Sequence, residues 1–158
     1  MTRTARFATT IAALALSTTV AATIAYGQDD AQPASQHLQY YVHFSPFTLV
    51  DIGAKGTSRG DQIVSSDQIF AQSGRKVGRD TQACVITKLS PLEAECTLTF
   101  VFADGTITAQ YMGRQPPHKI AAVTGGTGKY IGARGQMTLV ESGHDNSPHN
   151  VLTFRLLN

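Results

Sequence analysis

The sequence has few charged residues and no surplus of either sign once its first residues are set aside. Only 15% of the 158 residues are charged, with 13 basic and 11 acidic side chains. Arg3 and Arg6 lie within the first 27 residues, which contain no acid, so 11 basic residues then stand against 11 acidic ones, a net charge of zero. Such a chain, without a stripe of Lys or Arg, attracts phosphate backbones weakly. We therefore expect no nucleic-acid partner.

Helical periodicity is also lacking. Short runs rich in Val, Ile, Thr, Phe and Tyr alternate with Gly, Pro, Asp and Ser, which is typical of an all-β protein. Eight strands close most naturally into an antiparallel β-barrel, because closure removes the sheet edges. We predict "ADGT" as the tightest hairpin, and strands at 39–52, 61–72, 77–89, 94–103, 106–113, 118–124, 135–142 and 150–157.

The sequence contains no recognisable phosphate or metal motif. The glycine-rich run "AVTGGTGKYIGARGQ" resembles a phosphate-binding loop at first sight, but Val123 and Tyr130 occupy the places where that loop needs Gly and Ser or Thr. Among the five histidines, His144 and His149 flank a loop and the others are scattered, which is not the spacing of a metal site. No metal and no cofactor are expected.

The N-terminus has the pattern of an export signal. In residues 1–27, two arginines precede an uncharged stretch, and "AYG" places small residues where a signal peptidase cuts. The alternative is a membrane span, although many Thr and Ser residues dilute the hydrophobicity. We predict a signal peptide at 1–27, a flexible leader at 28–37 and one domain at 38–158. The protein would then be secreted or periplasmic and leave the membrane after cleavage.

The chain has only two cysteines, Cys84 and Cys96. "CVITKLSPLEAEC" reads as a strand, a turn around Ser90-Pro91 and a second strand, so the two side chains can face each other across a hairpin. In an oxidising compartment this favours a disulfide. The alternative is a reactive thiol at Cys84.

Alternation along the strands indicates which residues face the barrel interior. In "CTLTFVF", Phe100 lies on the same face of the strand as Cys96. In "TITAQYM", Tyr111 lies on the same face of its strand as Ile107. The opposite faces are also partly apolar, so one face lines the interior and the other is exposed or buried against another subunit. We take Phe100 and Tyr111 as candidate ligand contacts.

Several segments, in order, resemble the dirigent and allene oxide cyclase barrel superfamily over nearly the whole exported chain. They are "GDQIVSSDQIF", "GRKVGRDTQACV", "FADGTITAQ" and, most specifically, "AVTGGTGKYIGARGQ". The resemblance implies an eight-stranded antiparallel barrel, commonly trimeric, with an apolar cavity at one mouth. Its glycines would be structural, allowing backbone conformations that side chains forbid: Gly125, Gly126, Gly128, Gly132 and Gly135.

The resemblance also implies site residues. Dirigent proteins carry the Arg of the glycine-rich block in their cavity, which corresponds to Arg134, and an acid of the first strand, which matches Asp51. The alternatives are an ion pair at the barrel rim for Arg134 and a turn for Asp51. The cavity cysteine of allene oxide cyclases corresponds to Cys84, and an asparagine of theirs becomes Asp67, a further candidate ligand contact.

Two functions remain open. The first is a cofactor-independent cyclase or dirigent-type protein, which holds a small apolar molecule in one reacting geometry and stabilises developing charge through Asp51 and Arg134. The second is a secreted barrel that binds such a molecule without turnover, because a fold alone does not determine function. In both readings we expect a homotrimer.

Overall fold

The computed structural model describes residues 35–113, 118–143, 147 and 149–157, so the predicted signal peptide lies outside the described residues. The described chain is almost entirely β-structure, and it contains no helix long and apolar enough to cross a membrane. The elements are β1 (Ser35–His43), β2 (Thr48–Val50), β3 (Gln62–Ser65), β4 (Gln68–Phe70), β5 (Lys76–Leu89), β6 (Leu92–Phe102), β7 (Gly105–Gly113), β8 (His118–Gly126), the short 3₁₀ helix η1 (Gly128–Tyr130), β9 (Arg134–Val140) and β10 (Val151–Leu157).

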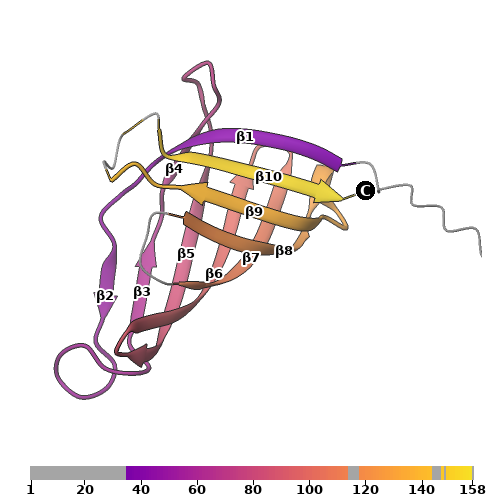
Figure 1. Cartoon of the computed structure of the whole chain (residues 1–158). Helices are drawn as coiled ribbons and strands as arrows, with labels where there is room; N and C mark the ends of the chain where they lie inside the picture. Colours follow the sequence, from indigo (N-terminus) through magenta and orange to yellow (C-terminus); the bar gives the residue numbers. More distant parts are fainter. Residues whose placement is uncertain (1–34, 114–117, 144–146, 148, 158) are drawn as a thin grey trace, which may run out of the picture. The chain divides into compact units, whose positions relative to one another are not determined.

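The strands form one closed antiparallel ring (Figure 1). Neighbours follow the order β5, β4, β1, β10, β9, β8, β7 and β6, and β6 pairs again with β5. Beyond this ring, β3 continues the edge of β5 and carries β2 on its other side. The predicted eight-stranded barrel is therefore confirmed, because β1 with β2 and β3 with β4 each occupy one strand position.

Two of the predicted strands are interrupted. In the first, the backbone N–H groups at the break are not available for pairing with a neighbouring strand. The run 39–52 breaks at residues 44–47, where Pro46 has no N–H for a ladder and the Ser45 N–H donates to Oδ1 of Asp67. The run 61–72 breaks at Ser66 and Asp67. The first strand also begins at Ser35, so residues 35–37 belong to β1 and not to the predicted leader.

The barrel has a packed half and an open half. Toward the end of β6, Phe100 and Phe102 meet Phe154 and Tyr130 from β10 and η1, with ring centroids 4.9 Å apart for Phe100–Phe154 and 5.6 Å for Phe102–Tyr130. Together with Met137 these side chains are buried in the core. Aromatic packing thus fills the end of the barrel that carries η1.

The glycine-rich block closes this packed end. Gly135 has φ +135°, and a Cβ there would lie 2.1 Å from the carbonyl oxygen of Arg155 on β10. Gly128 has φ +58° and a Cβ would lie 2.3 Å from the carbonyl oxygen of Asp104. Both positions therefore require glycine. Gly132 also has positive φ and Gly126 lies against backbone, whereas Gly125 has an ordinary φ and room for a Cβ.

A buried carboxylate organises the loop after β2. Asp61 is fully buried, and its Oδ2 accepts from the Ser58 N–H at 2.7 Å while Oδ1 accepts from the Ile52 N–H at 3.0 Å. These backbone hydrogen bonds lower the pKa of Asp61 below its ordinary value of 3.8. The carboxylate therefore stays ionised and holds the loop against the end of the sheet.

Candidate functional site

A cavity of about 480 Å³ occupies the half of the barrel opposite η1. Its floor and walls come from β3, the middle of β5, the first half of β6, the start of β8 and the ends of β7 and β9, and the segment 44–47 borders its mouth. Phe47, which lines it, is 67% exposed, so the cavity reaches the surface there. The apolar lining includes Phe44, Phe47, Ile63, Leu92, Leu98 and Leu139.

Two aspartates lie side by side in the cavity wall. Asp67 sits at the break between β3 and β4, and Asp80 lies on β5; each is buried and each lines the cavity. The Asp67 N–H lies 3.2 Å from Oδ1 of Asp80, and the Asp80 N–H donates to the Asp67 carbonyl at 3.0 Å. The interruption of the strand therefore places the Asp67 backbone against the Asp80 carboxyl group, with both side chains in the cavity wall.

The environment of Asp80 favours its neutral form. Burial is the main cause, and the neighbouring Asp67 carboxylate adds to it, whereas the Asp67 N–H and the Lys119 ammonium oppose the shift. The net effect raises the pKa of Asp80 from 3.8 to about 7. At neutral pH the carboxyl of Asp80 is thus present both with and without its proton, which suits a group that exchanges protons with a bound molecule.

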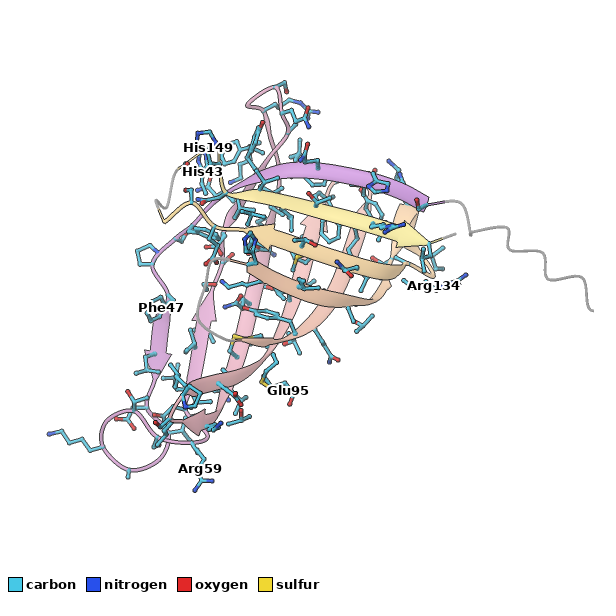
Figure 2. All side chains as sticks on the ribbon, in the orientation of Figure 1. His43, Phe47, Arg59, Glu95, Arg134 and His149 are labelled. Atoms are coloured by element: carbon cyan, nitrogen blue, oxygen red, sulfur yellow. A yellow bond between two sulfur atoms is a disulfide. The ribbon has the colours of Figure 1, made fainter. Side chains whose placement is uncertain are left out.

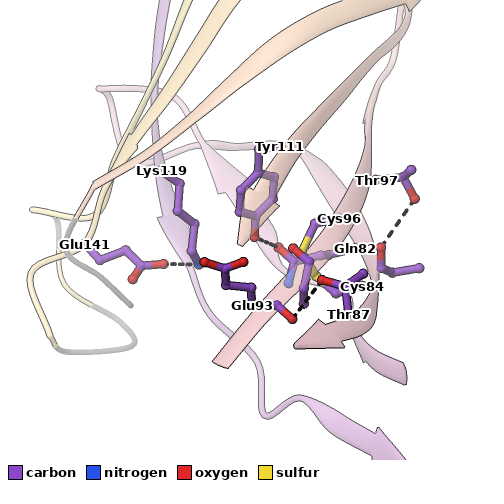
Figure 3. The surroundings of a disulfide bond; sticks show 11 residues. Gln82, Cys84, Thr87, Glu93, Cys96, Thr97, Tyr111, Lys119 and Glu141 are labelled. Atoms are coloured by element: carbon purple, nitrogen blue, oxygen red, sulfur yellow. Dashed lines mark hydrogen bonds and ion pairs between the residues drawn. A yellow bond between two sulfur atoms is a disulfide. The ribbon is translucent and has the colours of Figure 1, made fainter. Parts of the chain in front are cut away.

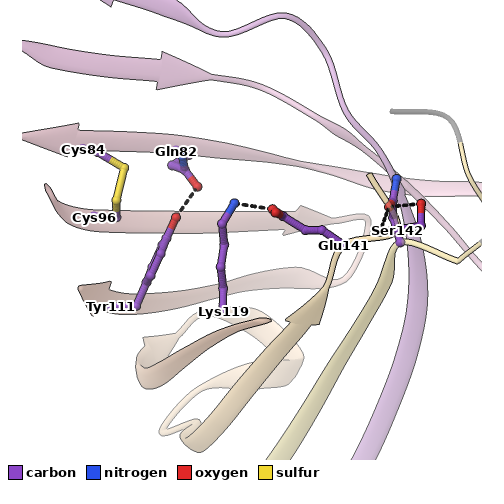
Figure 4. A network of polar contacts seen from close by, with 8 residues as sticks. Gln82, Cys84, Cys96, Tyr111, Lys119, Glu141 and Ser142 are labelled. Carbon is purple, nitrogen blue, oxygen red and sulfur yellow. Dashed lines mark hydrogen bonds and ion pairs between the residues drawn. A yellow bond between two sulfur atoms is a disulfide. The ribbon is translucent and has the colours of Figure 1, made fainter. Parts of the chain in front are cut away.

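A second set of polar side chains faces the same space (Figure 4). The Tyr111 hydroxyl on β7 donates to Oε1 of Gln82 on β5 at 2.9 Å. Burial, with the carboxylates of Glu141, Asp80 and Asp67, raises the pKa of Tyr111, so this hydroxyl keeps its proton. Lys119 of β8 forms an ion pair with Glu141, just after β9, and its Nζ lies 6.0 Å from the ring centre of Phe44.

The predicted disulfide is confirmed, and it is part of the cavity wall. Cys84 and Cys96 are direct partners on β5 and β6, with Cα atoms 4.0 Å apart, and their sulfurs are bonded (Figure 3). Both are buried and line the cavity beside Tyr111 and Gln82. Since the sequence has no other cysteine, the alternative of a reactive thiol at Cys84 does not hold for the oxidised protein.

A family model described as the allene oxide cyclase barrel like domain matches residues 37–153. The chain belongs to this family. The match covers every described residue of the cavity wall and all the barrel strands except the first two residues of β1 and the last four of β10. No curated protein matches the chain.

Solved structures with the same barrel catalyse or direct different reactions. A pyocyanin demethylase is 27% identical, with a TM-score of 0.66, and the alignment covers 77% of this chain and 99% of the other. A pterocarpan synthase dirigent protein is 16% identical, with a TM-score of 0.58 and coverage of 78% and 83%. A Diels–Alderase from Streptomyces koyangensis is 13% identical, with a TM-score of 0.55 and coverage of 81% and 71%. The last two show likeness of fold alone.

The structure does not bring Asp51 and Arg134 into this allene oxide cyclase-like cavity, contrary to what the resemblance implied. Asp51 is exposed after β2, where its Oδ2 accepts from the Gly56 N–H at 2.9 Å, as in a turn. Arg134 is exposed at the start of β9, on the other side of the barrel from Phe47 (Figure 2). They cannot act together in one cavity, and a catalytic role for either stays a prediction.

Of the three predicted ligand contacts, two line the cavity and one does not. Asp67 and Tyr111 line the cavity. Phe100 faces inward as predicted, but it packs edge-on against Phe154 in the filled half of the barrel and does not line the cavity. The alternation identified the interior face correctly, whereas the depth at which the cavity ends depends on how the aromatic rings pack.

Sequence reasoning missed Asp80, Gln82, Lys119 and Glu141. For Asp80 and Gln82 a signal was present, because they share the inward face of β5 with Cys84 at a spacing of two. Lys119 shares a strand face with the buried Ala121 in the same manner. Glu141 lies just beyond β9 and carries no comparable signal. Across the described part of the chain, no three metal-ligating side chains come together.

Proposed function

We propose that the cavity binds a small, largely apolar organic molecule and directs its cyclisation or stereoselective coupling without a cofactor. The observation that carries the proposal is the buried Asp67–Asp80 pair in the wall of a cavity that apolar side chains and a few polar ones line together. Buried carboxyl groups are costly to keep unless they have a function or full compensation. A cavity of about 480 Å³ has the size of sites that enclose ligands of drug-like dimensions.

Orientation and proton exchange are the two contributions that this site can make. Phe44, Leu98 and the disulfide offer apolar surfaces that restrict a flexible molecule to few conformations, which lowers the entropic part of the barrier. Asp80 can accept or return a proton, and Lys119 can stabilise negative charge that develops nearby. No step of this kind requires a metal or a redox group.

The family supports this assignment. The structures with the same barrel include a pterocarpan synthase dirigent protein, a Diels–Alderase and a pyocyanin demethylase, each named for a reaction of a small organic molecule. Their names describe different reactions. The shared fold therefore provides a binding cavity, and the residues that line the cavity determine which reaction takes place.

The proposal can be tested with purified protein and two kinds of reactant, an unsaturated fatty-acid epoxide, and a phenol with an added one-electron oxidant that generates the phenoxy radicals and takes up the electrons. We expect one product stereoisomer in excess, and loss of that excess in Asp80→Asn. Glu95→Gln is the matched control, because Glu95 alternates with the inward-facing Ala94 and Cys96 and is exposed (Figure 2). Racemic product at the uncatalysed rate from a broad reactant panel would contradict catalysis.

A binding protein without turnover is the second candidate. It is favoured by the mutual pairing of Tyr111 with Gln82 and of Lys119 with Glu141, which leaves these groups satisfied without a reacting partner. Native mass spectrometry of protein purified from its own source separates the two candidates. A stoichiometric ligand that is recovered unchanged after incubation indicates binding alone.

We also infer export and assembly into a homotrimer. The export rests on the N-terminal pattern, and an intact mass that begins after Gly27 in protein recovered from the cell exterior or periplasm would support it. The trimer rests on exposed apolar side chains of the outer barrel face, Met112, Ile120 and Val85. Sedimentation at micromolar concentration measures the mass, and a value of one chain would contradict assembly.

A further inference from the structure

The strands show at which level of the barrel the cavity ends. On β6, the inward-facing Leu98 lines the cavity, whereas Phe100, the next inward residue toward η1, does not. On β9, Leu139 lines the cavity, whereas Met137, the next inward residue toward η1, is fully buried and does not. The apolar part of the floor therefore consists of Leu98 and Leu139, with the packed half of the barrel behind them.

The neighbours of Leu98 cannot fill the space that it occupies. Leu98 lies directly opposite Ala109 on β7 and opposite Gln82 on β5. Directly opposed side chains on one face of a sheet are near neighbours. Ala109 is too short to reach into a gap beside it, and Gln82 is held by the hydrogen bond that it accepts from Tyr111 at 2.9 Å. A shorter side chain at position 98 would therefore leave open space.

The surroundings of Leu139 differ in this respect. Leu139 lies directly opposite Leu152 on β10, which is fully buried and as large as Leu139 itself. A leucine can change its side-chain conformation and occupy part of a gap beside it, which an alanine cannot do. A shorter side chain at position 139 would therefore deepen the cavity less than the same change at position 98.

We propose that Leu98 is the residue that determines how long a ligand the cavity accepts. This inference rests on the proposed function and adds the property by which the site selects among apolar molecules. In a cavity closed at one end, an apolar chain gains about fourfold in affinity with each methylene group that it buries. The gain stops when the chain meets the floor and its other end reaches the solvent.

The packed aromatic residues give the deepened cavity a new and definite end. Phe100 is 1% exposed and packs edge-on against the fully buried Phe154, with ring centroids 4.9 Å apart. Each ring holds the other, so this layer stays in place when Leu98 is shortened. Leu98→Ala removes three side-chain carbons, which leaves room for about two or three methylene groups of a ligand before it meets Phe100.

A series of 1-alkanols from butanol to dodecanol measures the accepted length. The alcohols displace N-phenyl-1-naphthylamine, a neutral dye that fluoresces in apolar sites, from the full chain with its disulfide intact. In the unmodified protein, we expect the affinity to rise about fourfold per methylene group and then to reach a plateau. In Leu98→Ala, the plateau should begin at alcohols about two carbons longer, and these should bind about tenfold more tightly than to the unmodified protein. In Leu98→Phe, it should begin at shorter alcohols.

Matched leucine variants separate depth from a general loosening of the fold. Leu156→Ala removes the same atoms from a buried leucine of β10 that does not line the cavity, so the plateau should stay where it is. Leu139→Ala should move it less than Leu98→Ala does. If circular dichroism shows that Leu98→Ala does not fold, Leu98→Val provides the same test, with an expected shift of about one carbon.

Several results would overturn the inference while the proposed binding function stands. These are an unchanged plateau in the folded Leu98 variants, an equal shift in Leu156→Ala, and an equal shift in Leu139→Ala, which would assign the floor to both leucines. Failure of the dye and of every alcohol to bind the unmodified protein would overturn the proposed function as well.

Discussion

Asp80→Asn should stabilise the protein at alkaline pH and have little effect in mild acid. The amide keeps the shape of the carboxyl group, and its Oδ1 can still accept from the Asp67 N–H. In the wild type, the folded state holds a proton on Asp80 up to about pH 7, whereas an ordinary aspartate loses it near 3.8. Since the folded state binds more protons than the unfolded state in this range, the free energy of unfolding falls as the pH rises from about 4 to 7.

The size of the effect follows from the shift. A rise of about three pKa units corresponds to about 4 kcal/mol, because each unit is worth about 1.4 kcal/mol. Asp80 is 4% exposed, so solvent screening removes little of this. For a domain of this size we expect Asp80→Asn to raise the melting temperature by about 5 °C or more at pH 8.

Thermal unfolding by circular dichroism between pH 4 and 9 gives the test, with Glu95→Gln as the control at an exposed site. The wild type should lose stability with rising pH up to about 7, and this slope should be smaller in Asp80→Asn. An equal gain at pH 5 and pH 8, or a loss at both, would show that Asp80 is ionised in the folded protein throughout and would refute the reasoning.

Three further outcomes concern the scaffold. Replacing Cys84 and Cys96 together by Ala should lower the free energy of unfolding by about 3 kcal/mol in urea titrations, because the disulfide restricts a short loop of the unfolded chain; an unchanged midpoint would argue against this. Asp61→Asn should destabilise at pH 7, and the difference should shrink as the pH falls below 3.8, because the folded state lowers this pKa; a difference that grows in acid would contradict the carboxylate's role. Gly135→Ala should lower the melting temperature far more than Gly132→Ala, since only the former places its Cβ against backbone; equal losses would exclude that clash.

The β-strands and their closure into a barrel were predictable because the residue pattern that indicates them lies within each short segment of the sequence. Alternation of apolar and polar residues identified the inward face of β6, and it placed Cys84 opposite Cys96 through a simple hairpin. The two interrupted strands were not predictable in this way. Their breaks depend on Asp67 accepting the N–H of Ser45 in the segment 44–47, a contact that forms only when β1 and β4, distant in the sequence, have paired.

The candidate site was only partly accessible from the sequence for a related reason. Asp51, between Val50 and Ile52, looks like an acid within a strand, but the glycines that follow turn the chain and leave it exposed. The pairing of Asp67 with Asp80 requires the register of β4 against β5. Alternation alone would have placed Asp80 on the inward face with Cys84, so this residue could have been found.

The filled half of the barrel determines the route by which a molecule can enter and leave the cavity. Phe100, Phe102 and Tyr130 occupy the space beyond Leu98, so a molecule that enters beside Phe47 reaches a dead end. Under the proposed catalytic function, reactant and product would pass through the opening beside Phe47 in opposite directions, and slow release of the product would block binding of the next reactant. Under the same proposal, inhibition by product should be competitive, and product release can limit the rate of turnover more than bond formation does.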